Sequence, residues 1–299
     1  MHNNKHSASG RVPACGRGCA RRGGDVPSPG KTGVACVSHS ETEGEAPTAL
    51  LCEGATQAPE NETLDILCEE RLKVIQKKNG YRFSLDAFLL ANFVTLKRGE
   101  RLLDIGTGCG IIPIYISKRG YNNSMLGVEI QEDLFNLAVK NKALNDIGDH
   151  VQFHKGDIRK EVKELKKRPF HIVVSNPPYT KKGSGRTNPG HSRYIARYES
   201  HLDLAGLVST ASSLLAKKGR FYVIYPTKRL GELISTAQSS KLALKRLRLV
   251  YPKKDAEANL FLAEFIKEGG IGVKVEKPLF VYDNGHITEE VRKYYVLKG

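Results

Sequence analysis

The sequence contains no tryptophan and only two methionines, Met1 and Met125. It also lacks any uninterrupted apolar run of the roughly 20 residues that a bilayer-spanning helix needs, so no membrane protein is expected. The amino terminus carries scattered charges but no apolar core of a signal peptide, which favours a cytoplasmic protein. The six cysteines are then expected to be reduced thiols rather than a disulfide framework.

Residues 1–60 differ in composition from everything that follows. They are rich in Gly, Ser, Pro, Thr and Ala without sustained periodicity, which is typical of a disordered extension. Because Met125 is the only methionine after Met1, we also hold the hypothesis that translation starts at a non-AUG codon within this segment. Residues 61–299 are predicted to form the folded domain. Four side chains of the extension match no strong zinc spacing, so no metal site is predicted: Cys15, Cys19, Cys36 and His39.

Acidic residues are scarce relative to basic ones, and the net charge of +15 suggests an acidic partner. Residues 180–197 and 241–254 are both basic without a single acid, which fits a surface that contacts phosphates. The alternatives are an ordinary loop for the first segment and an ordinary strand with a solvated face for the second. In the first segment we expect five side chains to contact RNA: Lys181, Lys182, Arg186, Arg193 and Arg197.

Beyond the extension, short apolar strands alternate with helical patterns. Ser84 is a good N-cap for a helix over residues 84–94, and residues 131–146 have helical apolar spacing. Such alternation predicts a mostly parallel sheet covered by helices on both faces, and the last two strands, which follow each other closely, predict an antiparallel end. The expected strands are residues 101–105, 124–130, 151–157, 171–176, 220–226, 244–252 and 259–267.

A glycine-rich turn, "DIGTGCG", follows the first of these strands. Gly106, Gly108 and Gly110 let the backbone bend tightly and approach a ligand closely. The dinucleotide fingerprint needs a glycine at its sixth position, which here is Ile111, so that fingerprint fails. The observed spacing instead suits S-adenosylmethionine (SAM), whose amino-acid end has no pyrophosphate.

Three acids stand at successive strand ends. Asp104 can bind an ammonium group, Glu129 can accept both hydroxyls of a ribose, and Asp157 can accept from an exocyclic amine. Each acid alone is more often a helix cap or a solvated turn. Three together at the carboxyl edge, where open α/β sheets bind ligands, predict a cofactor site.

The fourth strand runs into "NPPY". Neither proline can donate a ladder hydrogen bond, so the strand must end there. Asn176 offers an acceptor oxygen, and Pro177 and Pro178 hold it in place while leaving the Pro177 carbonyl available. Tyr179 offers a flat face. This combination can hold a planar amino group between two acceptors and stack the ring that carries it, whereas the alternative is a proline-terminated strand with a packing tyrosine.

The motifs "DIGTGCG", "GVEI", "GD" and "NPPY", in this order, resemble class I SAM-dependent methyltransferases that modify amino groups. "NGYRFSLDAFLLANFV", "ARYE", "YPKKDAEANLFLAEFIKEG" and "PLFVYDNGHITEEV" are similar to the bacterial family that methylates N6 of adenosine 37 in a valine tRNA. The resemblance covers residue 63 to the carboxyl terminus. Tyr198 departs from the family, where histidine is expected, while Arg197 and Glu199 remain.

The resemblance implies a Rossmann-like fold with a seven-stranded, mostly parallel sheet, helices on both faces and an antiparallel C-terminal strand. It implies SAM as cofactor, S-adenosyl-L-homocysteine as product, and a tRNA anticodon loop as partner. Asn176 and the Pro177 carbonyl would accept hydrogen bonds from the target amine, Pro178 would fix them, and Tyr179 would stack on the flipped base. The expected cofactor residues are Phe83, Asp86, Asp104, Gly106, Gly108, Gly110, Glu129, Asp157, Ile158 and Asn176.

Other functions are compatible with the same residues. A protein glutamine N5-methyltransferase would also need Asn176, although the positive charge favours RNA. A guanine-N2 RNA methyltransferase fits the charge but resembles the C-terminal stretch less. A catalytically silent protein that binds SAM and RNA is the alternative from another class. An NAD-dependent dehydrogenase is disfavoured by the glycine spacing.

Overall fold

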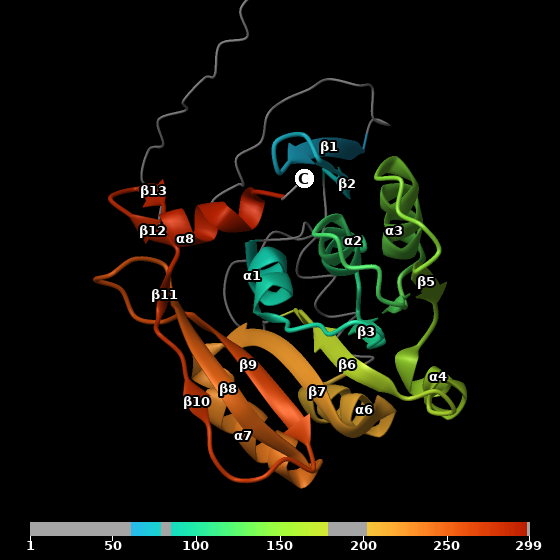
Figure 1. The fold of residues 1–299 in the computed structure, drawn as a ribbon, viewed down its shortest axis with the longest axis vertical. Helices are drawn as coiled ribbons and strands as arrows, with labels where there is room; N and C mark the ends of the chain where they lie inside the picture. The colour runs from blue at the N-terminus through green and yellow to red at the C-terminus, as the bar shows by residue number, and fades with distance from the viewer. Residues whose placement is uncertain (1–60, 79–84, 179–201, 298–299) are drawn as a thin grey trace, which may run out of the picture. The chain divides into compact units, whose positions relative to one another are not determined.

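The computed structural model describes residues 61–78, 85–178 and 202–297 (Figure 1). All of them belong to one compact unit, Ala46–Gly299. The extension predicted for residues 1–60 lies outside the described residues. None of the described helices is long and apolar enough to cross a membrane.

The described part of the chain is organised around one large sheet. Its strands run in the order β10-β8-β9-β7-β6-β3-β4-β5, and β11 pairs with β8 outside this path. From β7 to β5 the neighbours are parallel, whereas β9 is antiparallel to both β7 and β8. The seven longer strands confirm the seven predicted ones: β3 (Leu102–Ile105), β4 (Met125–Glu129), β5 (Val151–Lys155), β6 (Phe170–Ser175), β7 (Leu215–Pro226), β8 (Leu242–Tyr251) and β9 (Leu260–Lys267).

Two further strands raise the sheet to nine. They are β10 (Lys274–Val275) and β11 (Leu279–Phe280), and both pair with β8 in parallel. Each contains only two residues, which is too short for any alternation of apolar and polar side chains. The sequence therefore predicted the sheet without these two additions.

The central strands are apolar throughout because both faces of the sheet are covered. Along β6, Ile172 and Val174 lie in the hydrophobic core on one face, and Val173 lies in the core on the other. All three are fully buried. This is the pattern expected for parallel strands between two helix layers.

Within the described residues, six helices form these two layers (Figure 1). The predicted helices over 84–94 and 131–146 are confirmed as α1 and α3. One core contains side chains of α1, α2 and α3, and the other contains those of α4, α6 and α7. Their bounds are α1 (Leu85–Phe93), α2 (Ile111–Lys118), α3 (Glu132–Leu144), α4 (Ile158–Leu165), α6 (Leu204–Leu214) and α7 (Leu230–Ser239).

Short elements complete the described chain. An antiparallel hairpin, β1 (Glu62–Leu67) and β2 (Leu72–Lys77), packs on α3, and the sequence did not predict it. After the sheet, β12 (Tyr282–Asp283) pairs with β13 (His286–Ile287). The remaining elements are the 3-10 turn η1 (Thr227–Arg229), helix α8 (Glu289–Arg292), whose N-cap is Thr288, and the 3-10 turn η2 (Lys293–Tyr295).

Candidate functional site

Topology brings the predicted strand-end residues to one edge of the sheet. The strands β5, β4, β3 and β6 are consecutive neighbours and run parallel. From β3 the chain proceeds toward β5 on one side and toward β7 on the other. The carboxyl end of β3 is thus a topological switch point, where open α/β sheets bind ligands.

The glycine loop adopts the backbone conformation that its sequence predicts. Gly106, Gly108 and Gly110 have φ angles of 71°, 58° and 81°, which side chains with a Cβ rarely adopt. A Cβ on Gly110 would stand 2.6 Å from the Phe153 ring of β5 and 3.0 Å from Ala138 of α3. Glycine is therefore required there both for conformation and for close packing.

Asp104, at the end of β3, is buried with an unused acceptor. One carboxylate oxygen accepts a hydrogen bond from Thr107 Oγ1 at 2.7 Å, and the other, Oδ1, has no partner among the described residues. Burial raises the pKa of this carboxyl from 3.8 to about 7, Thr107 opposes the shift, and nearby Glu129 adds to it. An unpartnered buried oxygen fits a cationic donor such as the ammonium group of SAM.

Glu129, at the end of β4, is only 1% exposed. Its Oε2 accepts from the Gly108 amide at 2.9 Å and its Oε1 accepts from the Gln131 amide at 2.9 Å. Burial raises its pKa, while these backbone hydrogen bonds oppose the shift. Each oxygen retains a second lone pair, so the carboxylate fits a pair of ribose hydroxyls.

Asp157, after β5, begins α4. Its carboxylate caps the helix by accepting from the Arg159 amide at 3.0 Å, and it also binds the Arg159 guanidinium. These hydrogen bonds lower the pKa of Asp157. The structure thus places Asp157 at the predicted edge but with an intramolecular partner that the sequence analysis missed. An arginine two residues after the predicted acid was the available signal.

The proline motif follows β6 directly. Ser175 Oγ donates to the Ile105 carbonyl at 2.8 Å and ties the end of β6 to the start of the glycine loop. Asn176 is half-buried, and Pro177 and Pro178 are buried. The described part of the motif, Asn176 to Pro178, therefore lies beside the β3 loop.

The remaining predicted residues are distributed as follows. Asp86 is half-buried in α1, and Ile158 is 6% exposed in the first turn of α4. Phe83 and Tyr179 lie outside the described residues, and so do the five expected RNA contacts Lys181, Lys182, Arg186, Arg193 and Arg197. Their roles stay predictions.

The sequence analysis missed a pair of buried asparagines on α3. Asn141 Nδ2 donates to the Cys109 carbonyl of the glycine loop at 3.0 Å, and its Oδ1 accepts from the Ile75 amide of β2 at 2.7 Å. Asn145 exchanges two hydrogen bonds with the Lys73 backbone. Two buried asparagines one helical turn apart were the only sequence signal of this contact.

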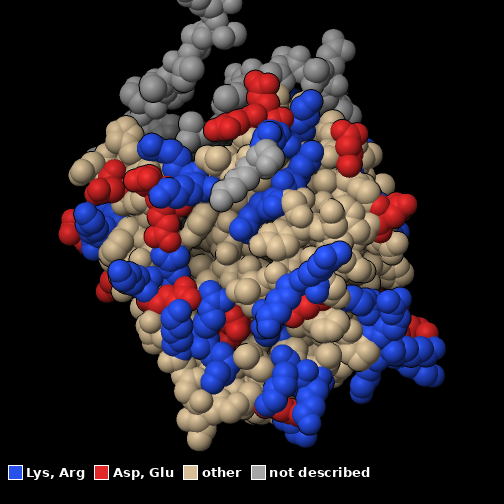
Figure 2. Space-filling view, in the orientation of Figure 1, with Lys and Arg blue, Asp and Glu red and all other residues tan. Residues whose placement is uncertain are grey.

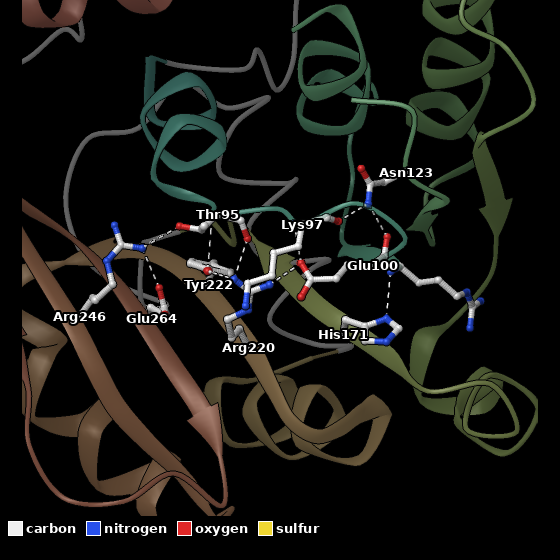
Figure 3. Close-up of polar contacts among 10 residues, drawn as sticks. Thr95, Lys97, Glu100, Asn123, His171, Arg220, Tyr222, Arg246 and Glu264 are labelled. Carbon is white, nitrogen blue, oxygen red and sulfur yellow. Dashed lines mark hydrogen bonds and ion pairs between the residues drawn. The ribbon is translucent and has the colours of Figure 1, made fainter. Parts of the chain in front are cut away.

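The structure also reassigns part of the second basic segment. Arg246 forms ion pairs with Glu264 and Glu276, and Arg248 pairs with Glu290. Arg246 further donates to Thr95 and lies over the Phe93 ring, so it anchors the chain after α1 (Figure 3). These two arginines are therefore engaged in ion pairs within the chain, and phosphate contact by this segment stays a prediction.

A second set of polar contacts continues this anchoring toward β3. Arg220 donates to the Thr95 carbonyl at 2.8 Å and pairs with Glu100, and the Tyr222 hydroxyl accepts from the Thr95 amide (Figure 3). Asn123 donates to two carbonyls of the same segment, those of Lys97 and Glu100. The network fixes the link between α1 and β3 at the amino edge of the sheet, away from the strand ends that form the site.

The described part of the chain contains no group of three or more His, Cys, Asp or Glu side chains placed to hold a metal ion.

Known proteins match this chain in sequence and in fold. A family model for the methyltransferase small domain matches residues 84–232. A tRNA1(Val) (adenine(37)-N6)-methyltransferase of Porphyromonas gingivalis is 30% identical over 207 residues, covering 67% of this chain and 80% of that protein. One from Flavobacteriaceae bacterium is 27% identical, covering 69% of this chain and 86% of that protein. A predicted O-methyltransferase of Agrobacterium tumefaciens aligns with a TM-score of 0.57 and 21% identity, covering 70% of this chain and 95% of that chain.

The sheet order, the glycine loop and the strand-end acids define a class I SAM-dependent methyltransferase. Within this class, the chain belongs to the family of the tRNA1(Val) (adenine(37)-N6)-methyltransferases.

Proposed function

We propose that this protein transfers the methyl group of SAM to the exocyclic N6 amine of an adenosine in RNA, at position 37 of a valine tRNA. The observation that carries the proposal is the placement of Asn176, Pro177 and Pro178 at the end of β6, next to the β3 loop. The names of the relatives and the net charge of +15 support an RNA substrate in the cytoplasm.

The cofactor would lie along the ends of β3, β4 and β5. Asp104 Oδ1 supplies an acceptor for the ammonium of its methionine end, Glu129 supplies acceptors for the ribose, and Asp157 supplies an acceptor for the adenine amine. When bound, SAM supplies an electrophilic methyl group on a sulfonium. The glycine loop allows close approach because it carries no Cβ at its three turns.

The target amine needs orientation more than a base. Its lone pair is delocalised into the adenine ring, so it is a poor nucleophile. The Asn176 oxygen and the Pro177 carbonyl, as two acceptors for its protons, favour a pyramidal nitrogen and aim the lone pair at the methyl group. Orientation of this kind can lower a barrier by up to about 7–11 kcal/mol. The amine proton leaves after transfer, so no strong general base is required.

Replacement of Asn176 tests this proposal. We expect Asn176→Ala to lose methyl transfer to tRNA by about a hundredfold or more, as when an orienting group is lost, while its Kd for SAM stays within a few fold of wild type. The matched control is Asn136→Ala, because Asn136 is exposed on α3 and should leave both values unchanged. Full turnover by Asn176→Ala would contradict the assigned role, and label incorporated into protein glutamine rather than RNA would contradict the substrate.

A further inference from the structure

The amino edge of the sheet, opposite the candidate site, gathers basic side chains from five separate segments. Arg101 precedes β3, Lys166 and Arg168 connect α4 to β6, and Lys217 lies near the start of β7. Lys267 ends the antiparallel β9 and pairs in register with Leu242, so the preceding Lys241 lies beside it. We call these six side chains the basic edge. Lys and Arg gather over α4 and near the end of β9 (Figure 2).

Contacts of the described residues hold these segments together. Arg101 Nη1 donates to the Arg168 carbonyl, and its guanidinium lies 4.5 Å from the centre of the Phe170 ring. Lys267 Nζ donates to the Leu215 carbonyl at 2.8 Å. Both hydrogen bonds go to uncharged backbone carbonyls, so they do not neutralise the positive charges of Arg101 and Lys267.

Acidic partners are scarce along this edge. None of the six side chains forms an ion pair within the described ranges. The neighbouring acids are Glu100, which precedes Arg101 and already pairs with Arg220, Glu164, which already pairs with Lys167, and Glu268, which is exposed beside Lys267. Described cations nearer the carboxyl edge are paired instead, as in Arg229 with Glu232 and Lys254 with Asp283.

The like charges are close enough to affect one another. Burial lowers the pKa of Lys267, and Lys166 and Lys241 lower it further while Glu268 opposes them. Burial likewise lowers the pKa of Arg101, and Arg168 adds to the shift. Like charges held together without acids destabilise a fold, so such a cluster is better explained by a polyanionic partner.

We propose that the basic edge binds the phosphate backbone of the RNA substrate, as a second contact surface remote from the catalytic one. This inference rests on the proposed function and adds to it a requirement for RNA beyond the target loop. Phosphate contacts of Lys and Arg position an RNA without reading its sequence, which suits a cluster of cations that no acid neutralises.

The spacing across the sheet sets the length of RNA that this surface requires. Strand β6 contains six residues between the basic edge and Asn176, which corresponds to about 20 Å at roughly 3.3 Å per residue. A nucleic-acid duplex covers that distance in about six base pairs. A stem attached to the target loop is therefore long enough to contact both surfaces, whereas an isolated loop is not.

Charge reversal on the basic edge tests the inference. The variant is Lys166→Glu combined with Lys217→Glu, because both side chains are exposed and neither contacts the candidate site. The control, with the same change in net charge, is Lys274→Glu combined with Lys277→Glu, two exposed lysines in the segment from β10 to β11. Binding of a labelled full-length tRNA transcript is measured over a range of salt concentrations, with a loop-only oligonucleotide of about seven nucleotides in parallel.

For the basic-edge variant we expect at least about tenfold weaker tRNA binding. We also expect the slope of log Kd against log salt concentration to fall by about two, one unit for each lost phosphate contact. The Kd for SAM, the binding of the short oligonucleotide and kcat at saturating tRNA should match wild type. The control variant carries the same change in net charge. It should therefore show only the small, non-specific weakening of tRNA binding that the charge change itself causes.

Three results would overturn the inference. If both double variants bind tRNA equally well, the basic edge makes no RNA contact, and methylation by the wild type in the same preparation would show that the proposed function stands. If the basic-edge variant retains tRNA binding but loses binding to vesicles of acidic phospholipid, the partner is a membrane surface. If the wild type neither binds nor methylates tRNA, the proposed function itself fails.

Discussion

Arg159 holds the Asp157 carboxylate with a bidentate contact: Nε donates to Oδ1 at 3.0 Å and Nη2 donates to Oδ2 at 2.6 Å. Asp157 is the side chain assigned to the adenine amine of SAM. The same two oxygens therefore serve an intramolecular partner and, in the proposed function, the cofactor. In the proposed function, this pair would couple the start of α4 to cofactor binding.

Removal of Arg159 should strengthen SAM binding. The Arg159 side chain is exposed, and ion pairs of this kind contribute little free energy, so Arg159→Ala should lower the Kd for SAM by only a small factor. Isothermal titration calorimetry measures this, with Lys160→Ala as the control because Lys160 is the next exposed base on α4. Weaker SAM binding by Arg159→Ala would mean that Arg159 orients Asp157 rather than competing for it.

The raised pKa of Asp104 makes SAM binding depend on pH. Burial, the largest cause, moves this pKa from 3.8 to about 7. The ionised form binds an ammonium group better, so SAM affinity should rise as the pH rises through about 7 and should level off above it. Titration of SAM at several pH values measures the effect. Asp104→Asn should bind SAM weakly at every pH, and a wild-type affinity independent of pH would contradict the assignment.

The same group affects the stability of the protein without cofactor. Because the pKa of this acid is higher when folded than when unfolded, the folded state holds a proton that the unfolded state releases. The Asp104 contribution to the free energy of unfolding should therefore fall as the pH rises from about 4 to about 7 and stay constant above that. Urea unfolding should show Asp104→Asn gaining stability relative to wild type at the higher pH. If the difference in free energy of unfolding between Asp104→Asn and wild type were the same at the low and the high end of this pH range, the account would be contradicted.

Glycine substitutions separate backbone strain from close packing. Gly110 and Gly99 have φ angles of 81° and 82°, but only Gly110 has neighbours that a Cβ would strike. Gly99→Ala should cost about 1–2 kcal/mol of stability from strain alone. Gly110→Ala should cost an additional ~1–3 kcal/mol because the Phe153 ring must move, and it should weaken SAM binding. Chemical denaturation compares the stability of the two variants. Equal losses of stability would show that the Phe153 ring moves aside without cost.

Asn141 should connect the hairpin to the cofactor loop. Asn141→Ala would leave the Ile75 amide and the Cys109 carbonyl without their side-chain partner, at a cost of about 2–3 kcal/mol. We expect faster hydrogen exchange at the Ile75 amide and weaker SAM binding. Asn136→Ala, on the exposed face of the same helix, should change neither. Unchanged exchange at Ile75 in Asn141→Ala would show that the hairpin is held by other contacts.

Local patterns were sufficient for the seven longer strands of the sheet, because each follows a short run of apolar or alternating residues. Asp104, Glu129 and Asp157 follow or end neighbouring strands, and the parallel topology brings those strand ends to one edge. Local patterns were insufficient for β10 and β11, which exist only through pairing with β8.

Contacts between distant segments account for the rest. Arg246 lies in a segment that fits a phosphate-contacting surface by composition, but the sequence pattern does not show that cross-strand pairing places Glu264 beside it. The basic edge combines residues such as Lys166 and Lys267 that are far apart in sequence, and only Lys241 belongs to a basic segment that the sequence pattern singled out. The Asn141 bridge likewise joins α3 to β2 across 66 positions.

The most direct test of the central claim identifies the methylated nucleoside. Purified protein is incubated with tritiated SAM and total RNA from a strain that lacks this gene, and the labelled RNA is digested and separated. The account predicts label in N6-methyladenosine from the tRNA fraction. Label in another nucleoside, such as N2-methylguanosine, or label only in an added protein fraction, would contradict it.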